Sequence, residues 1–382
     1  MQANVSFTRA RSAILAVGGL VCLITLSGCA GGGGGGGLST LPAPFVYPNT
    51  LADAKSGDTV DGFMSPYAID GSTSELVSVS PSVSGTTPSQ GKISITINDI
   101  IVPQPPPVYA ITAERGFTVT FDSNSTSGTL LWLSSSNNPF ESLLTPCNSC
   151  LKTALAPATY ISDGSSAGKV TFTYLDSAAM GLTYSALGLW TKPSSLSSSW
   201  PEVGGAFSAG VLTRGVDLPT TGSANYQGYL IGRYVTSEAI ASSTFNGGYP
   251  AGSYIVAASA SATADFGANA ITSFSTTDTH IAPDSGGTAI AESRLNLSTF
   301  ATLPINRKTT DNGNEFEGTA VLSTDTVSGV FTGSPGKIAG GFYGKPDTSK
   351  TPYAPPELGG SLSVTNDTGT QSMVGSFAMT KQ

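Results

Sequence analysis

Four cysteines and one histidine carry the most specific chemistry that this sequence offers. Cys29 follows Leu26, Ser27 and Gly28, and small residues before a cysteine give a peptidase room to cleave the chain at that point. A cysteine that becomes the new N-terminus can carry a diacylglycerol on its thiol. The sequence therefore predicts lipid attachment at Cys29.

The residues before Cys29 have the pattern of an export signal. Arg9 and Arg11 supply a positive start, and an apolar run follows at residues 13–26. That run lies within the length of a signal core and is short of the ~20 residues that span a bilayer. We therefore expect residues 1–28 to be removed as a signal peptide.

The string LSGC at residues 26–29 resembles the lipobox of bacterial lipoproteins. An ordinary secretory signal with a chance cysteine is the alternative, but the glycine tract at residues 31–37 favours the lipoprotein. Seven glycines form a flexible tether, which suits a folded body that stands off a membrane. In the rule for such lipoproteins, an Asp after the cysteine retains the chain in the inner membrane. Ala30 occupies that position, so the resemblance implies the outer membrane.

Cys147 and Cys150 form the other candidate site, within the string PCNSC. In an oxidising compartment we expect a local disulfide between them, which would stabilise little because it closes a short loop. A redox role would need a helix N-terminus in a βαβ setting, and a zinc site would need four ligands. Redox, metal and free-thiol interpretations remain as alternatives.

An enzyme is the rival functional class, and its one candidate base of the usual kind is His280. A hydrolase needs a nucleophile, a base and an orienting group, and no nucleophile motif surrounds this histidine. We interpret His280 as a solvated loop residue, and we expect Glu315 and Glu317 to lie on the solvent-exposed face of a strand. The sequence thus predicts no catalytic residues, no cofactor and no metal.

Composition supports this interpretation and adds the fold class. Only 11% of residues are charged and the net charge is −8, or −10 once the signal with its two arginines is removed. An acidic chain of this kind is not expected to bind nucleic acid. Abundant Ser, Thr and Gly in alternating apolar and polar runs predict an all-β protein.

The strands fall into two regions. In the first region, apolar and polar residues alternate at residues 92–97, 117–121 and 170–174. Residues 29–57, before this region, comprise the lipidated cysteine and a Gly/Pro-rich tether. In the second region, we expect eight strands with glycines inside them, at residues 226–235, 253–266, 293–297, 316–322, 329–332, 338–343, 358–364 and 373–379. Glycine inside a strand marks a bend, so this region predicts an up-and-down eight-stranded antiparallel β-barrel.

The second region contains five characteristic strings: LPTTGSANYQG at residues 218–228, ATADFG at 262–267, GGFYG at 340–344, ELGGSLS at 357–363 and VGSF at 374–377. Together these strings resemble the barrel domain of the transferrin-binding protein B family of surface lipoproteins. The resemblance covers residues 203–382, with a looser match upstream at residues 184–190. The fold-signature residues are Gly341, Phe342, Tyr343, Gly344, Gly359, Gly360, Gly375 and Phe377.

The resemblance implies a β-rich handle-like domain at residues 58–200 and a barrel at 203–382. It implies a non-enzymatic, surface-exposed lipoprotein that binds a protein or small-molecule ligand, with nutrient or iron/haem-carrier capture as one possibility. A surface lipoprotein translocon and an outer-membrane receptor are the implied partners. A passive coat or adhesive lipoprotein is the alternative function, a hydrolase the more distant one, and the periplasmic face the alternative location. Residues 345–357 depart from the family as an inserted Pro-rich loop, interpreted as a longer hairpin connection or a ligand-facing addition.

Overall fold

The structure is a computed structural model. It describes residues 59–69, 76–77, 91–103, 111–121, 127–131, 151–155, 160–161, 171–175, 180–193, 202–239, 250–283, 289–299, 301–307, 314–321, 329–351 and 353–382. Residues 46–382 group into one compact unit, which contains every strand described below.

The first sheet uses strands from the first half of the chain. Its order is β6-β8-β9-β10-β1-β3-β4-β5-β7, with β2 added at β1, and every pairing is antiparallel. The alternating runs at residues 92–97 and 117–121 lie in β3 and β4, where Ile95 pairs with Val119. The strands are β1 Thr59–Ile69, β2 Leu76–Val77, β3 Gly91–Pro103, β4 Ile111–Phe121, β5 Ser127–Leu131, β6 Leu151–Leu155, β7 Tyr160–Ile161, β8 Thr171–Leu175, β9 Ser185–Pro193 and β10 Glu202–Gly210.

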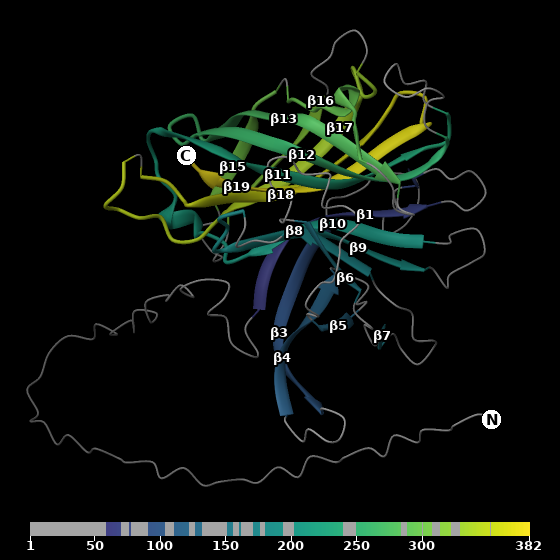
Figure 1. Cartoon of the computed structure of the whole chain (residues 1–382). Coiled ribbons are helices and arrows are strands. Elements are labelled where there is room, and N and C mark those ends of the chain that lie inside the picture. The colour runs from purple at the N-terminus through teal and green to yellow at the C-terminus, as the bar shows by residue number, and fades with distance from the viewer. Residues whose placement is uncertain are drawn as a thin grey trace, which may run out of the picture. The chain divides into compact units, whose positions relative to one another are not determined.

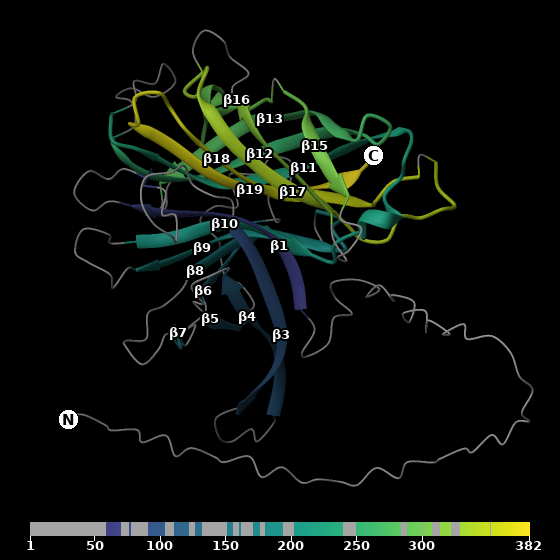
Figure 2. The same ribbon diagram turned by 180° about the vertical axis from the view of Figure 1, so that it is seen from behind.

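The second half closes into a ring of eight antiparallel strands, which confirms the expected all-β fold with a barrel (Figure 1). The order around the ring is β12-β11-β19-β18-β17-β16-β15-β13, and β13 pairs back to β12. The strands are β11 Ser223–Thr236, β12 Gly252–Asp265, β13 Ala270–Pro283, β15 Leu303–Arg307, β16 Asn314–Val321, β17 Pro335–Tyr343, β18 Glu357–Thr365 and β19 Gln371–Lys381. Seen from behind, β16, β17 and β18 can be followed side by side (Figure 2).

Alternation along these strands decides which side chains enter the barrel. In β12, Ala258, Ala260, Ala262 and Ala264 are buried, and the residues between them are hydroxyl-bearing. Small inner side chains on this strand leave room for the aromatic rings of the opposite wall. Over residues 258–264 the two-residue period therefore places an apolar face inside the barrel and a polar face outside it.

Two of the eight strand predictions are wrong. Residues 293–295 form a 3₁₀ turn, η3 (Ser293–Leu295), because the Glu292 side chain accepts a hydrogen bond from the Arg294 N–H. Residues 330–333 form a turn in which the Thr332 and Ser334 N–H groups donate to carbonyls three residues earlier. Segment 289–299, with the short β14 (Ile290–Ala291), instead lies along β13 through the Ser275–Ser298 bridge.

The prediction also missed β13 and β15. Strand β13 lacks a regular two-residue alternation of apolar and polar residues, because its register against β12 shifts twice, at Ala257/Ser259 and at Thr263/Ala264. Asp278 takes a φ of +52° beside the first shift, so the apolar and polar positions no longer alternate regularly.

Among the described residues, no helix is long and apolar enough to span a bilayer.

Candidate functional site

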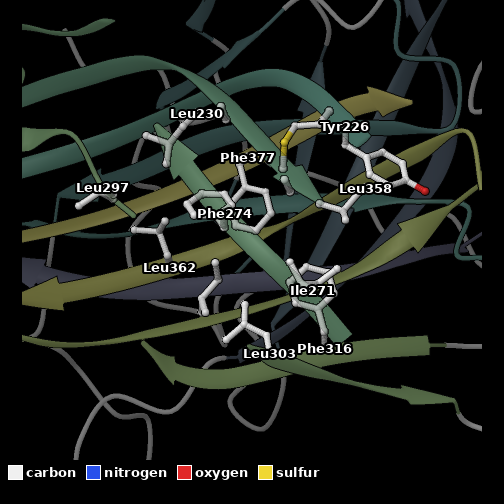
Figure 3. Packing of buried hydrophobic residues seen from close by; sticks show 14 of the residues in the cluster. Tyr226, Leu230, Ile271, Phe274, Leu297, Leu303, Phe316, Leu358, Leu362 and Phe377 are labelled. Carbon is white, nitrogen blue, oxygen red and sulfur yellow. The ribbon is translucent and has the colours of Figure 1, made fainter. Parts of the chain in front are cut away.

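The interior of the barrel is filled by side chains, so the described wall encloses a core (Figure 3). Phe274 and Phe377 meet with ring centroids 4.8 Å apart. Phe342 contacts Phe266 at 5.4 Å and Tyr226 at 5.9 Å. Aromatic pairs at these separations pack as in an ordinary protein core. A ligand of this barrel would therefore bind on its outer faces or its loops.

One end of the barrel is closed by the connection between the two sheets. Leu218, from this connection, is buried in the barrel core. Arg307, at the end of β15, donates hydrogen bonds to the carbonyls of Leu218 at 2.9 Å and of Phe266 at 3.2 Å, and also to that of Pro219. Its Nε donates to Asn269 Oδ1 at 2.7 Å. These four bonds use the planar guanidinium to fix the connection across the barrel end.

Asn314 fixes the same connection from β16. Its Nδ2 donates to the carbonyls of Thr213 at 2.6 Å and Phe342 at 3.0 Å, and its Oδ1 accepts the Phe342 N–H at 2.7 Å. The Thr213 N–H donates to the Phe342 carbonyl at 2.8 Å. Asn314 is 2% exposed, so its amide is fully used inside the protein and does not face a ligand.

Part of the outer wall of the barrel packs against the first sheet in a contact called here the seam. From the first sheet and the segment before it, the seam contains Leu182, Leu187, Leu189 and Ala206; from the barrel it contains Ile231, Ile255, Ala257, Ala282, Val374 and Ala378. Ser376 Oγ donates across it to the Gly188 carbonyl at 3.1 Å. The faces of β10, β11 and β19 in the seam are therefore not available to a ligand.

The fold-signature glycines allow this close packing. A Cβ on Gly341 would lie 3.0 Å from the Phe63 ring and 3.1 Å from the Asn314 carbonyl oxygen. A Cβ on Gly359 would lie 2.5 Å from Ser208 Oγ and 2.9 Å from the Phe377 carbonyl oxygen. Both positions require a missing side chain so that β1 and β10 can approach the barrel.

The remaining signature residues fill or turn the same strands. Phe342 and Phe377 point into the barrel core, whereas Tyr343 is buried on the opposite face and donates to the Ser208 carbonyl at 3.1 Å. Burial raises the pKa of the Tyr343 phenol, which keeps it neutral. Gly344 has a φ of +82° and begins the turn after β17. These residues build the wall and do not form a pocket.

Glu357, the first residue of β18, places a carboxylate inside the seam. Its Oε1 accepts the Thr183 N–H at 2.5 Å and the Tyr184 N–H at 3.0 Å, and its Oε2 accepts the Ser185 hydroxyl at 2.7 Å. The side chain is 2% exposed, and it accepts hydrogen bonds from N–H and O–H donors of residues 183–185. Burial raises the pKa of this carboxyl, and the donors act in the opposite direction.

Ser65, in β1, is the exception in this hydrogen-bonded region. It is 2% exposed, and its hydroxyl has no hydrogen-bond partner within the described part of the chain. Since burying an unpaired hydroxyl is unfavourable, Ser65→Ala is expected to raise the free energy of unfolding by about 1 kcal/mol. Ser376→Ala, which loses a bond to Gly188, should lower it by about 1 kcal/mol. Urea unfolding of both variants tests this difference in sign.

Strands β11, β12, β13 and β19 leave a polar outer face beyond the seam. One row of cross-strand neighbours contains Thr380, Gln227, Ser261, Ser275 and Ser298, and is called here the hydroxyl row. Gln227 is exposed and the other four side chains are partly exposed. Ser261 Oγ and Ser275 Oγ lie 2.9 Å apart. The row presents hydroxyl and amide groups from five neighbouring segments, and we take it as the candidate site.

His280 does not lie in the loop that we expected from the sequence. It belongs to β13, is partly buried, and its Nδ1 donates to the Asp278 backbone carbonyl at 2.8 Å. Glu315 and Glu317 lie on the outer face of β16, as expected for residues on the solvent-exposed side of a strand. Within the described ranges, no three His, Cys, Asp or Glu residues gather as a metal site. Cys29, Cys147 and Cys150 lie outside the described residues.

The inserted loop after β17 is partly anchored. Tyr353 donates its hydroxyl to the Asp217 carbonyl at 3.1 Å, Ala354 is buried in the barrel core, and Tyr226 donates to the Pro355 carbonyl at 3.0 Å. The exposed tip is shaped by Asp347, which accepts the N–H and hydroxyl of Ser349. The returning arm thus behaves as a hairpin connection packed on the barrel end.

Comparisons with known proteins find no matching family model and no matching curated protein. Among solved structures, a double mutant of transferrin-binding protein B from Haemophilus parasuis is 14% identical, covers 86% of this chain and 76% of its own, and has a TM-score of 0.34. Transferrin-binding protein B from serogroup B Neisseria meningitidis is 13% identical over 86% and 77%, with a TM-score of 0.30. A protein described as a surface lipoprotein is 13% identical over 53% and 77%, with a TM-score of 0.28. Likenesses at this level do not establish a family, so the functional argument depends on the residues of the chain itself.

Proposed function

We propose that this chain is a lipid-anchored protein of the outer membrane, displayed at the cell surface, whose barrel is a non-enzymatic binding module. The observation that carries the proposal is the segment at residues 26–37, where small residues precede Cys29 and a glycine tether follows it. Lipid on Cys29 would hold the N-terminus at the membrane, and the tether would let the folded body extend from it.

The described strands support binding on the outside of the barrel. The interior is filled, and one end is closed by Arg307 and Asn314. The strings that resemble the transferrin-binding protein B family lie in β11, β12, β17, β18 and β19, so they support the same barrel. A protein ligand, with a translocon and an outer-membrane receptor as further partners, is part of this proposal.

A passive coat protein is the second candidate, and the abundance of Ser, Thr and Gly in the chain favours it. The two functions differ in one measurable respect. A binding module retains a specific partner and gains thermal stability when its ligand is added, whereas a coat protein does neither.

The anchor is tested by labelling growing cells with radioactive palmitate. The wild-type chain should take up label, and Cys29→Ala should lose it entirely because no other residue becomes an N-terminal cysteine at this cleavage site. Cys22→Ala, in the apolar run that is removed, is the matched control and should keep the label. Label that persists in Cys29→Ala would show that the lipid is attached elsewhere, and a wild-type chain without label would show that it carries no lipid.

Exposure at the cell surface is tested by protease treatment of intact cells. A surface-displayed chain should be digested without permeabilising the outer membrane, and a periplasmic protein of the same cells should survive as the control. Protection of the full chain in intact cells would place it on the periplasmic face. The detergent-solubilised chain then serves as bait to capture the partner.

A further inference from the structure

The last strand of the chain, β19, lies in the middle of the structure. Along one edge it pairs with β11, from Tyr226 opposite Lys381 to Thr236 opposite Gln371, and along the other edge it pairs with β18. Since β11 is the first strand of the barrel, this pairing closes the ring across the whole barrel sequence. Without β19 the ring would be open, and the facing edges of β11 and β18 would be unpaired.

The two faces of β19 belong to different layers of the protein. Met373, Phe377 and Met379 point into the barrel core, where Figure 3 shows Phe377 among the core side chains. Val374 and Ala378 point outwards into the seam. All five side chains are buried, so one strand fills the barrel core and also covers the first sheet.

The end of the chain covers the middle of the first sheet. Strand β19 contacts β1, β9 and β10, and in Figures 1 and 2 it lies on the side of the barrel that faces β10. Ser376 Oγ donates to the Gly188 carbonyl across 188 positions of the chain, and Glu357 of β18 accepts bonds from residues 183–185. The first sheet is made first, but part of the layer that buries its apolar face is made last.

We propose that β19 is a closing strand, which completes the ring and fixes the first sheet in one step once residues 371–381 are free. Contacts between such distant residues form late, because closing a long loop costs entropy. Folded proteins are only marginally stable, so a strand with five buried side chains in two layers decides whether both layers persist.

The purpose of this device rests on the proposed function, because an exported chain must cross a membrane before it folds. A fold that depends on its last strand cannot close while the C-terminus is still being made or moved. The chain would therefore stay open during export and close after release.

The test cuts the folded full chain so that only non-covalent contacts hold β19. A protease site is inserted between Thr368 and Gly369, in the exposed turn between β18 and β19, and is cleaved after folding. Urea is then increased while mass spectrometry follows release of the C-terminal peptide. Tryptophan fluorescence follows the first half of the chain, because Trp132, Trp190 and Trp200 all precede the barrel.

Peptide release and the fluorescence change are expected at the same urea concentration, below the unfolding midpoint of the uncut chain. Transitions that coincide for independent probes indicate one cooperative unit. Excess synthetic peptide 369–382 should restore the fluorescence of the folded protein. A peptide with Phe377→Ala should need at least a tenfold higher concentration, because it leaves the barrel core unfilled.

The matched control carries the same protease site between Gly267 and Ala268, in the exposed turn between β12 and β13. Its cleavage leaves β19 joined to β18, so its midpoint should stay near that of the uncut chain. A midpoint of the test protein no lower than that of this control would overturn the role assigned to β19.

Two further outcomes would overturn the inference. One is release of the peptide while the fluorescence stays that of the folded protein, and the other is loss of the folded fluorescence while the peptide stays bound. Neither depends on the palmitate and protease results. An unlabelled or protected chain would overturn the proposed function, whatever the cut chain does.

Discussion

Gly360→Ala is expected to lower the free energy of unfolding by about 3 kcal/mol, at the upper end of the usual cost of overpacking a core. Gly360, in β18, pairs with Gly340 of β17. A Cβ at Gly360 would overlap the Ala339 carbonyl oxygen, and would lie 2.7 Å from Gly340 Cα and 2.8 Å from Phe377 Cζ. Two of these three neighbours are backbone atoms, so they yield only if β17 and β18 separate.

Gly267→Ala is the control for this prediction. In the turn between β12 and β13, the added Cβ would meet one atom within 4 Å, Asp265 Oδ1 at 3.3 Å. The stability of this variant should stay within about 0.5 kcal/mol of the wild type. Urea unfolding of the two variants gives the comparison, and equal losses would show that the barrel wall accommodates a methyl group at Gly360.

The barrel was predictable because its glycines and apolar positions are local signals. Strings such as GGFYG at residues 340–344 combine bend-permitting glycines with a residue that fills the core, and Phe342 does fill it. Strand β13 was not predictable from its period, because the bulge at Asp278 interrupts the alternation. The same bulge explains why His280 was interpreted as a loop residue.

The candidate site and the seam depend on contacts that a sequence read by periodicity does not reveal. Gln227 and Thr380 are paired across more than a hundred and fifty positions of the chain, and only the strand order brings them together. Ser and Thr at alternate positions indicate an outer face, but not which strands are neighbours. In the sequence, Glu357 is the last residue of a Pro-rich loop. The structure shows that its hydrogen-bond donors lie near residue 184, which no local pattern indicates.

Glu357→Ala is the second change with a large expected effect, a loss of about 3 kcal/mol in the free energy of unfolding. The substitution removes the acceptor of the Thr183 and Tyr184 N–H groups and of the Ser185 hydroxyl. Ser185 is fully buried, so its hydroxyl would lose its partner without gaining water. Leaving a buried donor unpaired costs about 1–3 kcal/mol, and bonds to a charged acceptor are at the stronger end. Glu317→Ala, on the exposed face of β16, is the control and should change stability little.

The pH dependence of the same residue has a definite sign. Burial raises the pKa of the Glu357 carboxyl above its ordinary value of 4.5, so the folded chain holds this proton more tightly than the unfolded chain does. Protonation of Glu357 therefore adds to the free energy of unfolding. This contribution is fully present below pH 4.5 and is lost as the pH rises through the folded-state pKa. Glu357→Gln cannot titrate here, so the stability of the wild type minus that of Glu357→Gln should decrease as the pH increases from 4. Urea unfolding of both proteins across the acid range measures this difference. A difference that instead grows with pH would mean that the donors at residues 183–185 outweigh burial and hold the carboxyl ionised.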